Sequence, residues 1–305
     1  MQSNQPDTPS LRMKHMNVSA RLRAWAVLSI LACAPLVNRA AEEAAAPAPE
    51  KKSLPWEKGS VSFGGFAAAF DSTVSFGRSR TGGVSFNAED LFDLDTSLTV
   101  LRVDAMYRPG SSLRHQVDFS YGAYHRSGST TLSSDLTIGD ITYPIGAKVD
   151  TVFNFDIIRG TYSYALLQDD RMRVSLGLGV YAVPLKVRIE GQTTGGHEAI
   201  EGANTTLPLP ALALGGQFQL IPKLFLYTGV EAMYLEISDF KGSLLEANVG
   251  LEYRPWKHVG FGLGYNSMSV NVEGETTKSH YPGVDFLGKV GVRYSGLMLY
   301  GKFTF

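Results

Sequence analysis

Apolar and polar residues alternate along most of the chain from residue 57 onward. At the carboxyl end, Leu297, Leu299, Phe303 and Phe305 fall on one side of an extended chain, and Gly301 interrupts the row. Successive side chains of a β-strand point to opposite faces, so a period of two indicates a strand. The alternation recurs in ten segments, and no long stretch keeps a 3.6-residue helical period. The sequence therefore predicts an all-β chain.

Turn signals divide the alternating region into ten strands. The predicted strands are 59–77, 97–108, 113–127, 148–166, 171–190, 205–221, 223–240, 243–255, 258–272 and 285–305.

Three of these strands do not keep one parity. The first changes parity at Gly64-Gly65 and the last at Ser295-Gly296. Glycine at such a place predicts a β-bulge, where the chain slips by one residue. The faces of 156–164 stay unassigned. Outside the strands, "NAEDLFDLD" at 87–95 is the one candidate for a short helix.

The connections alternate in length. "RPGSS", "LQDDR", "IPK" and "RPWKH" are short and rich in turn formers, whereas the polar connections 78–96, 128–147, 191–204 and 273–284 are longer. Tight turns at one end of a sheet and loops at the other are typical of transmembrane β-barrels. Aromatic residues near the tight turns predict an interfacial girdle made of Trp56, Tyr107, Tyr253 and Trp256. We expect a ten-stranded antiparallel transmembrane β-barrel.

The amino-terminal region reads as an export signal. Arg21 and Arg23 precede the apolar stretch "AWAVLSILACAPLV", and small residues follow it. A short apolar core behind a basic flank predicts a secretory signal peptide over 1–40, cleaved near Ala40. An Ala/Pro-rich linker over 41–56 and a barrel over 57–305 would follow. "ILAC" leaves open a lipoprotein signal, in which Cys33 becomes a lipidated amino terminus.

The end of the chain resembles the carboxy-terminal signature of Gram-negative outer-membrane β-barrel proteins. That signature is a final Phe preceded by apolar residues at alternate places, here Leu297, Leu299, Phe303 and Phe305, with Gly301 as a departure. The resemblance implies an outer-membrane location, contact with outer-membrane lipid and lipopolysaccharide, and recognition by the outer-membrane assembly machinery.

A soluble barrel or sandwich, with the apolar faces buried, would show the same alternation. Strands of 12–20 residues, longer than the soluble mode of about five or six, favour the membrane.

Composition excludes several classes of function. Five of the 28 Lys/Arg and one of the 29 Asp/Glu lie in residues 1–40, so the remainder carries 23 basic against 28 acidic residues. A mildly acidic chain without a basic patch does not predict nucleic-acid binding. With Cys33 as the only cysteine, a disulfide within one chain is impossible. We find no nucleotide or cofactor motif, and no oligomeric state is indicated.

Two short motifs suggest chemistry without establishing it. His125 and Ser127 in "YHRS" resemble the His-x-Ser pair of the lipid A 3-O-deacylase family, in which His would activate Ser for attack on an ester. Gly128, a larger barrel and the lack of an evident orienting acid depart from that family. Asp93 and Asp95 resemble the acidic rim of ten-stranded outer-membrane proteases, but no Asp-x-His matches. A solvated loop is the simpler interpretation of that pair.

Metal-ligand spacing is also absent. His197 and His280 lie in different loops, with no spacing that would hold a metal. We therefore predict no catalytic residue and no metal site.

The non-apolar face of the strands carries balanced charge. By parity, the predicted inward set is Arg102, Arg173, Arg254, Lys289 and Arg293 against Asp104, Asp118, Glu231, Glu246 and Glu252. Buried charges are tolerated when they pair, so we expect a network across the lumen. Arg102, Asp104 and Asp118 are its first candidates because their strands are adjacent. The predicted function is a non-enzymatic structural barrel or narrow small-solute channel. The alternatives are a lipid A-modifying hydrolase and a surface-binding barrel using loops 78–96 and 128–147.

Overall fold

A computed structural model describes residues 54–76, 84–138, 141–192, 198–237, 240–274 and 288–305. The predicted signal peptide, nearly all of the predicted linker, Cys33, His197 and His280 lie outside these ranges. In the described part of the chain, no helix is long and apolar enough to cross a membrane.

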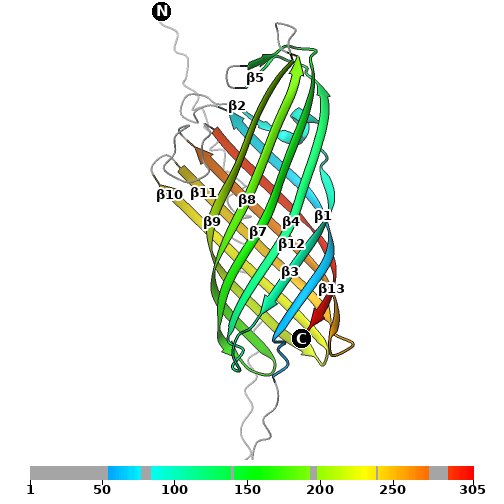
Figure 1. The fold of residues 1–305 in the computed structure, drawn as a ribbon, viewed down its shortest axis with the longest axis vertical. Helices are drawn as coiled ribbons and strands as arrows, with labels where there is room; N and C mark the ends of the chain where they lie inside the picture. The colour runs from blue at the N-terminus through cyan, green and yellow to red at the C-terminus, as the bar shows by residue number, and fades with distance from the viewer. Residues whose placement is uncertain (1–53, 77–83, 139–140, 193–197, 238–239, 275–287) are drawn as a thin grey trace, which may run out of the picture. The chain divides into compact units, whose positions relative to one another are not determined.

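Ten antiparallel strands close into a barrel (Figure 1). The barrel strands are β1 (Gly59–Phe76), β3 (Ser97–Tyr107), β4 (His115–Thr131), β7 (Lys148–Gln168), β8 (Met172–Gln192), β9 (Glu198–Ile221), β10 (Leu224–Ile237), β11 (Phe240–Tyr253), β12 (Val259–Gly274) and β13 (Gly288–Thr304). Each strand pairs with its neighbour in chain order, and β13 pairs with β1 from Ser60↔Thr304 to Phe76↔Gly288. The predicted fold, a ten-stranded antiparallel transmembrane β-barrel, is confirmed.

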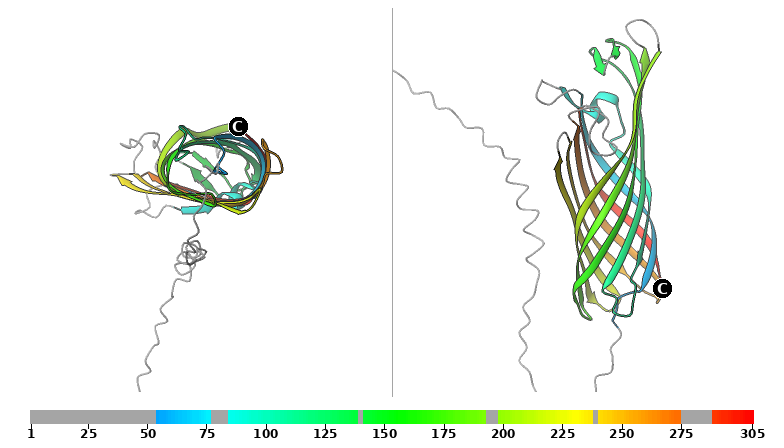
Figure 2. Two further views of the ribbon diagram at one scale, coloured as in Figure 1. Left: turned by 90° about the horizontal axis from the view of Figure 1, so that it is seen from below. Right: turned by 60° about the vertical axis from the view of Figure 1, so that its left-hand side comes forward.

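Two views show the barrel wall and its uneven height (Figure 2). Seen along its axis, the wall is a closed ring, and from the side β7 and β8 rise beyond the ends of β10 and β11. The predicted polar connection over 191–204 is therefore too long, because β8 continues to Gln192 and β9 begins at Glu198.

Four small elements lie between the barrel strands. β2 (Val84–Asn87) pairs with the far end of β1, and β5 (Leu136–Ile138) pairs with β6 (Ile141–Tyr143). The predicted helix exists as α2 (Ala88–Phe92), which Asn87 caps by accepting a hydrogen bond from the Asp90 N–H at 3.0 Å.

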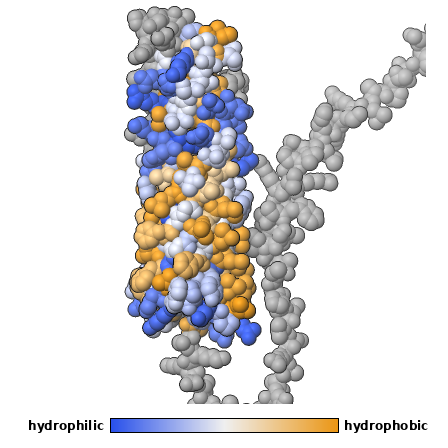
Figure 3. Space-filling view, turned by 90° about the vertical axis from the view of Figure 1, so that its right-hand side faces the viewer, coloured by the Kyte–Doolittle hydropathy of each residue, from blue (hydrophilic) through white to orange (hydrophobic). Residues whose placement is uncertain are grey.

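On the face seen in Figure 3, a band of apolar side chains covers the lower part of the barrel, with hydrophilic residues at the rim below and over the wall above. Every barrel strand contributes an outward apolar residue that is 45–74% exposed: Phe63, Leu101, Phe119, Tyr162, Leu178, Leu212, Tyr234, Leu251, Leu263 and Leu299. Water does not tolerate so large a continuous apolar surface, whereas a bilayer requires it.

The two predicted bulges are wrong, and one cause explains both. β1 pairs with β13 and with β3 without a register shift, so parity is continuous through Gly64-Gly65 and through Ser295-Gly296. What changes is the polarity of the faces. Ser60 and Ser62 point inward beside the apolar belt, whereas the inward residues farther along β1 are Phe66 and Phe70.

The same inversion accounts for the strand that could not be assigned. In β7 the odd-numbered residues point inward on both sides of Ile157: Thr161 and Ser163 beside the belt, Phe153 and Phe155 above it. Above the lipid the outside of the wall meets water, so the apolar residues move inside. The upper barrel thus has an ordinary apolar core that includes Phe92 of α2 and Leu132.

The predicted aromatic girdle is correct for three of its four members. Tyr107, Tyr253 and Trp256 are exposed at the end of the barrel that carries the tight turns, the tight-turn end. Trp56 is instead buried, and its indole N–H donates to the Asp169 carbonyl at 2.8 Å.

Candidate functional site

The lumen beside the apolar belt is filled by charged and polar side chains. A central cluster consists of Arg102, Asp104, Arg159, Tyr181, Glu231, Glu246 and Asn266. A tight-turn cluster consists of Glu57, Arg108, Gln116, Arg173, Gln217, Glu252, Arg254 and Lys302. Aromatic rings close the lumen above the central cluster.

The central cluster crosses the lumen from wall to wall. Arg159 on β7 reaches Glu231 on β10, with Nη1 3.0 Å from Oε1, and its distance to Glu246 on β11 is 3.8 Å. The Tyr181 hydroxyl lies 2.9 Å from Glu231 Oε2 and 2.7 Å from Glu246 Oε2. On the other side, Arg102 of β3 lies 3.9 Å from Glu246. Side chains therefore join opposite walls of the lumen, whereas an open pore would keep these walls apart.

The tight-turn cluster lies across the lower mouth. Arg108 donates to Gln116 Oε1 at 2.9 Å and to Gln217 Oε1 at 2.8 Å, and Arg173 donates to the same Gln116 oxygen at 2.7 Å. Glu252 accepts from Arg254 Nε at 2.6 Å and pairs with Lys302 at 3.1 Å. Arg254 also contacts the Tyr227 hydroxyl.

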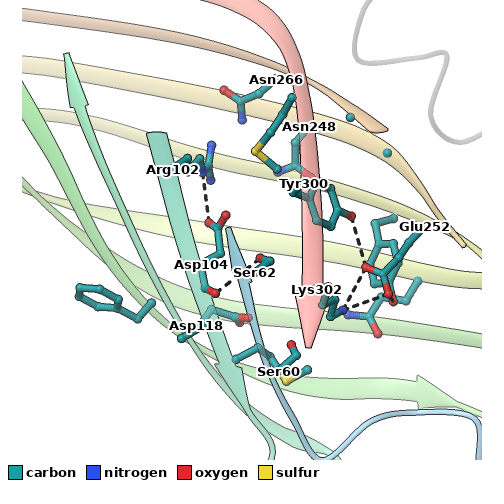
Figure 4. Close-up of a pocket in the computed structure, with 18 of the residues that line it drawn as sticks. Ser60, Ser62, Arg102, Asp104, Asp118, Asn248, Glu252, Asn266, Tyr300 and Lys302 are labelled. Carbon is teal, nitrogen blue, oxygen red and sulfur yellow. Dashed lines mark hydrogen bonds and ion pairs between the residues drawn. The ribbon is translucent and has the colours of Figure 1, made fainter. Parts of the chain in front are cut away.

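A cavity of about 210 Å³ lies between the two clusters (Figure 4). Ser60, Ser62, Asn248 and Asn266 line it with neutral polar groups, and Asp104 and Asp118 line it with carboxylates. Gln116 Nε2 donates to both Asp118 oxygens at 2.8 Å. Among the described residues, Asp118 forms no ion pair.

Five rings form an aromatic layer above the central cluster: Phe66, Phe70, Tyr124, Phe155 and Tyr294. Tyr124 stacks on Phe155 at 5.0 Å between centroids and on Tyr294 at 5.2 Å. Because β4, β7 and β13 supply these three rings, the layer spans the barrel. A smaller, apolar cavity of about 40 Å³ lies against Phe155 and Tyr294.

At the loop end α2 is held by a buried ion pair. Arg126 of β4 donates to Glu89 Oε1 at 2.6 Å and to the Ser72 hydroxyl at 2.8 Å. The Ser72 N–H donates to Glu89 Oε2 at 2.8 Å, and the Arg126 guanidinium lies 4.4 Å from the Phe70 ring centre. Burial raises the pKa of Glu89, but its hydrogen bonds from Arg126 and Ser72 outweigh burial and bring the pKa below its ordinary value.

Eight of the ten predicted lumen charges point inward. Four of them belong to the central cluster (Arg102, Asp104, Glu231, Glu246) and three to the tight-turn cluster (Arg173, Glu252, Arg254), and Asp118 lies between the two clusters. Arg102 and Asp104 pair at 3.1 Å, but Asp118 does not join them.

Lys289 and Arg293 are on the outer face, which corrects their assignment. That assignment depended on a bulge at Ser295-Gly296, and without the bulge both residues share the parity of Leu297 and Leu299. Arg293 is exposed and lies 3.7 Å from Asp71.

Four further charges point inward, and parity and element boundaries hid three of them in the sequence. Arg159 falls in the strand whose faces were unassigned, Arg108 in a turn, and Glu57 just before β1. Lys302 lies on the polar side of the terminal alternation, and this signal was visible in the sequence. With these residues included, the two clusters and their cavity hold six cations (Arg102, Arg108, Arg159, Arg173, Arg254, Lys302) and six carboxylates (Glu57, Asp104, Asp118, Glu231, Glu246, Glu252).

The terminal residues named from the signature lie on the outer face of β13 or just beyond its end. Leu297, Leu299, Phe303 and Phe305 are 54–67% exposed, within the apolar belt. Phe305 and Gly59 exchange backbone hydrogen bonds of 2.9 and 3.0 Å, which close the barrel at its lower rim.

The two motifs with candidate chemistry have different surroundings. His125 Nε2 lies 3.1 Å from Asp156 Oδ1, and Ser127 is exposed on the same outer face, two residues along β4. Asp156 supplies the acidic partner that sequence reasoning did not find. Asp93 instead ends α2 in a left-handed conformation (φ 50°). Among the described residues, no group of three His, Cys, Asp or Glu side chains could hold a metal.

Comparison with known proteins gives architecture only. No family model matches the chain, and no curated protein matches it. Among solved structures it is similar to the outer membrane protease OmpT from Escherichia coli, with 8% identity over 84% of this chain and 99% of that chain, at a TM-score of 0.49. It is also similar to Ail of Yersinia pestis, with 11% identity over 80% of this chain and 99% of that chain, at a TM-score of 0.32. The toluene transporter TodX of P. putida is similar with 6% identity over 81% of this chain and 90% of that chain, at a TM-score of 0.34.

Proposed function

We propose that the protein is a non-enzymatic outer-membrane β-barrel of a Gram-negative bacterium. Its lumen is closed, and it serves as a structural component of that membrane or as a narrow channel for small solutes that opens by rearrangement. One observation carries the proposal: the central cluster and the aromatic layer both join opposite walls of the lumen. A diffusion pore of the porin type would need this space to hold water.

The apolar belt supports a location in lipid, with the tight-turn end on the periplasmic side. Ten strands place the short turns at one end and the longer connections at the other, as in barrels inserted from the periplasm. The belt would contact outer-membrane lipid and lipopolysaccharide. We expect the assembly machinery to recognise the end of β13, where Phe305 completes the closure.

Cell fractionation and gel mobility test the location. We expect the protein in the outer-membrane fraction, and unboiled samples in SDS should migrate differently from boiled ones, because a closed hydrogen-bonded wall resists detergent. A chain that stays soluble without detergent and shows one mobility would contradict the proposal. Deleting Phe305 should lower the amount assembled.

A second candidate function is ester hydrolysis at the outer rim. The contact of 3.1 Å between His125 and Asp156 favours it, because a carboxylate that orients an imidazole is what a serine nucleophile requires. Ser127 lies on the same face but does not hydrogen-bond to His125 in the described structure. The substrate would be an acyl ester of outer-membrane lipid, such as lipid A.

Mass spectrometry of lipid A separates the two functions. The non-enzymatic proposal expects identical acylation in cells with and without the protein. Loss of an acyl chain that returns in Ser127→Ala would establish the hydrolase. Ser129→Ala is the matched control, because Ser129 is exposed two residues farther along the same face of β4.

A further inference from the structure

The segment just before β1 is built into the tight-turn mouth of the barrel. We call residues 54–58 the strap. Its Trp56 is 4% exposed, packs against Phe225 with ring centres 6.2 Å apart and donates to Asp169. The carbonyl oxygen of Glu57 accepts a hydrogen bond of 2.7 Å from Arg108. The strap is therefore part of the closed barrel and not a loose tether.

Three cations of the barrel wall converge on one carboxylate of the strap. Glu57 Oε1 lies 2.8 Å from Lys302 Nζ, and Glu57 Oε2 lies 2.8 Å from Arg254 and 3.5 Å from Arg108. The Glu57 side chain is only 5% exposed. Burial raises the pKa of Glu57, but Lys302, Arg108 and Arg254 outweigh burial and hold the pKa well below its ordinary value. The occupant of this place is thus an ionised carboxylate.

Without the Glu57 carboxylate, the side chains of the barrel wall around it would carry a net positive charge. Arg108, Arg173, Arg254 and Lys302 then face Glu252 within the tight-turn cluster. Asp118 borders the cluster and is joined to Arg108 and Arg173 through Gln116, so four cations remain against two carboxylates. Arg108 has no exposed side chain surface, and Lys302 has 9%. Buried cations without a counter-charge are strongly unfavourable, so the wall requires an anion at this position.

We propose that the tight-turn mouth is an anion-binding site for carboxylates, which the strap occupies with Glu57 as an intramolecular ligand. Two arginines beside one oxygen and a lysine beside the other suit the two oxygens of a carboxylate better than a spherical anion. Displacement of the strap would offer the site to a carboxylate-bearing solute and uncover the adjoining cavity, which Glu57 and Lys302 both line. This inference goes beyond the proposed function and does not depend on whether the barrel conducts.

Replacement of the intramolecular ligand by acetate tests the site. In refolded Glu57→Ala at pH 7, sodium acetate should raise the urea midpoint progressively relative to equal sodium chloride, because a ligand of the folded state stabilises it by mass action. Wild type should show no such difference. Glu190→Ala is the matched control, since Glu190 also pairs with an arginine (Arg188, 3.2 Å) but at the exposed surface.

A further variant ties the effect to the cations. Glu57→Ala combined with Arg254→Met should lose most of the acetate response. If Glu57→Ala does not refold in chloride, the folded yield becomes the readout, and acetate should restore it. The proposal is overturned if acetate affects Glu57→Ala no more than Glu190→Ala. It is also overturned if Glu57→Ala fails to refold in chloride and acetate does not raise its folded yield.

Discussion

At the residue scale, the fold depends on buried charges that find partners far away in sequence. Arg126 is the clearest case, because it joins the wall to α2 through Glu89 while its guanidinium lies over Phe70. Sequence reasoning found neither member. A pair of this kind leaves no signal in the alternation, since the partners are 37 residues apart and one of them lies in the short helix α2.

We expect Arg126→Ala to destabilise the protein by about 3–5 kcal/mol, the usual cost of removing one partner of a buried ion pair. Urea unfolding in lipid vesicles would measure the loss. The exposed pair formed by Arg188 and Glu190 gives the comparison, since Arg188→Ala should cost no more than about 1 kcal/mol. Equal losses in the two variants would contradict the role given to Arg126.

The lowered pKa of Glu89 predicts how stability depends on acid. A carboxyl group whose folded-state pKa lies below its unfolded value stabilises the fold fully above the unfolded value. That stabilisation is lost as the pH falls through the folded value. Wild type should therefore lose stability more steeply than Glu89→Gln between about pH 5 and pH 3. Parallel urea midpoints for the two proteins across this range would refute the assignment.

At the scale of the element, each long strand has two halves whose apolar side chains face in opposite directions. β1 keeps one parity throughout, and β7 keeps one as far as Ala165, where its register with β8 shifts. In both strands the apolar face is outside beside the belt and inside above it. Alternation alone predicts the strands well, because both halves have period two. It cannot distinguish an inversion of polarity from a bulge, since both appear as a change in which residues are apolar. The misplacement of Lys289 and Arg293 follows from that ambiguity.

The belt predicts a position-dependent cost along one strand. Leu178 and Lys186 lie on the same outer face of β8, within the belt and above it. Leu178→Lys should destabilise the barrel in vesicles by about 2–4 kcal/mol, the cost of a lysine at the bilayer midplane. Lys186→Ala should change the free energy of unfolding by less than about 0.5 kcal/mol, as exposed surface substitutions do. A small cost at Leu178 would place the belt outside the lipid.

At the scale of the whole molecule, the lumen is closed in layers. From the tight-turn end these are the strap, the tight-turn cluster, the central cluster and the aromatic layer. The balance of positive and negative charge in the lumen was predictable from the charged residues on the non-apolar face of the strands. The pairing of these charges within the lumen was predictable from the same residues. The strap was not predictable, because Glu57 and Trp56 precede the first strand. The aromatic layer was not predictable either, because an alternating pattern alone places the apolar Phe66 and Phe70 on the face toward lipid.

Single-channel recording in planar bilayers tests the closed lumen most directly. The wild-type barrel should give no stable openings of porin size. Tyr124→Ala combined with Glu246→Ala should raise the frequency or size of openings, because it removes the stacked ring and the carboxylate that join opposite walls. Large, long-lived openings from the unmodified protein would contradict the account.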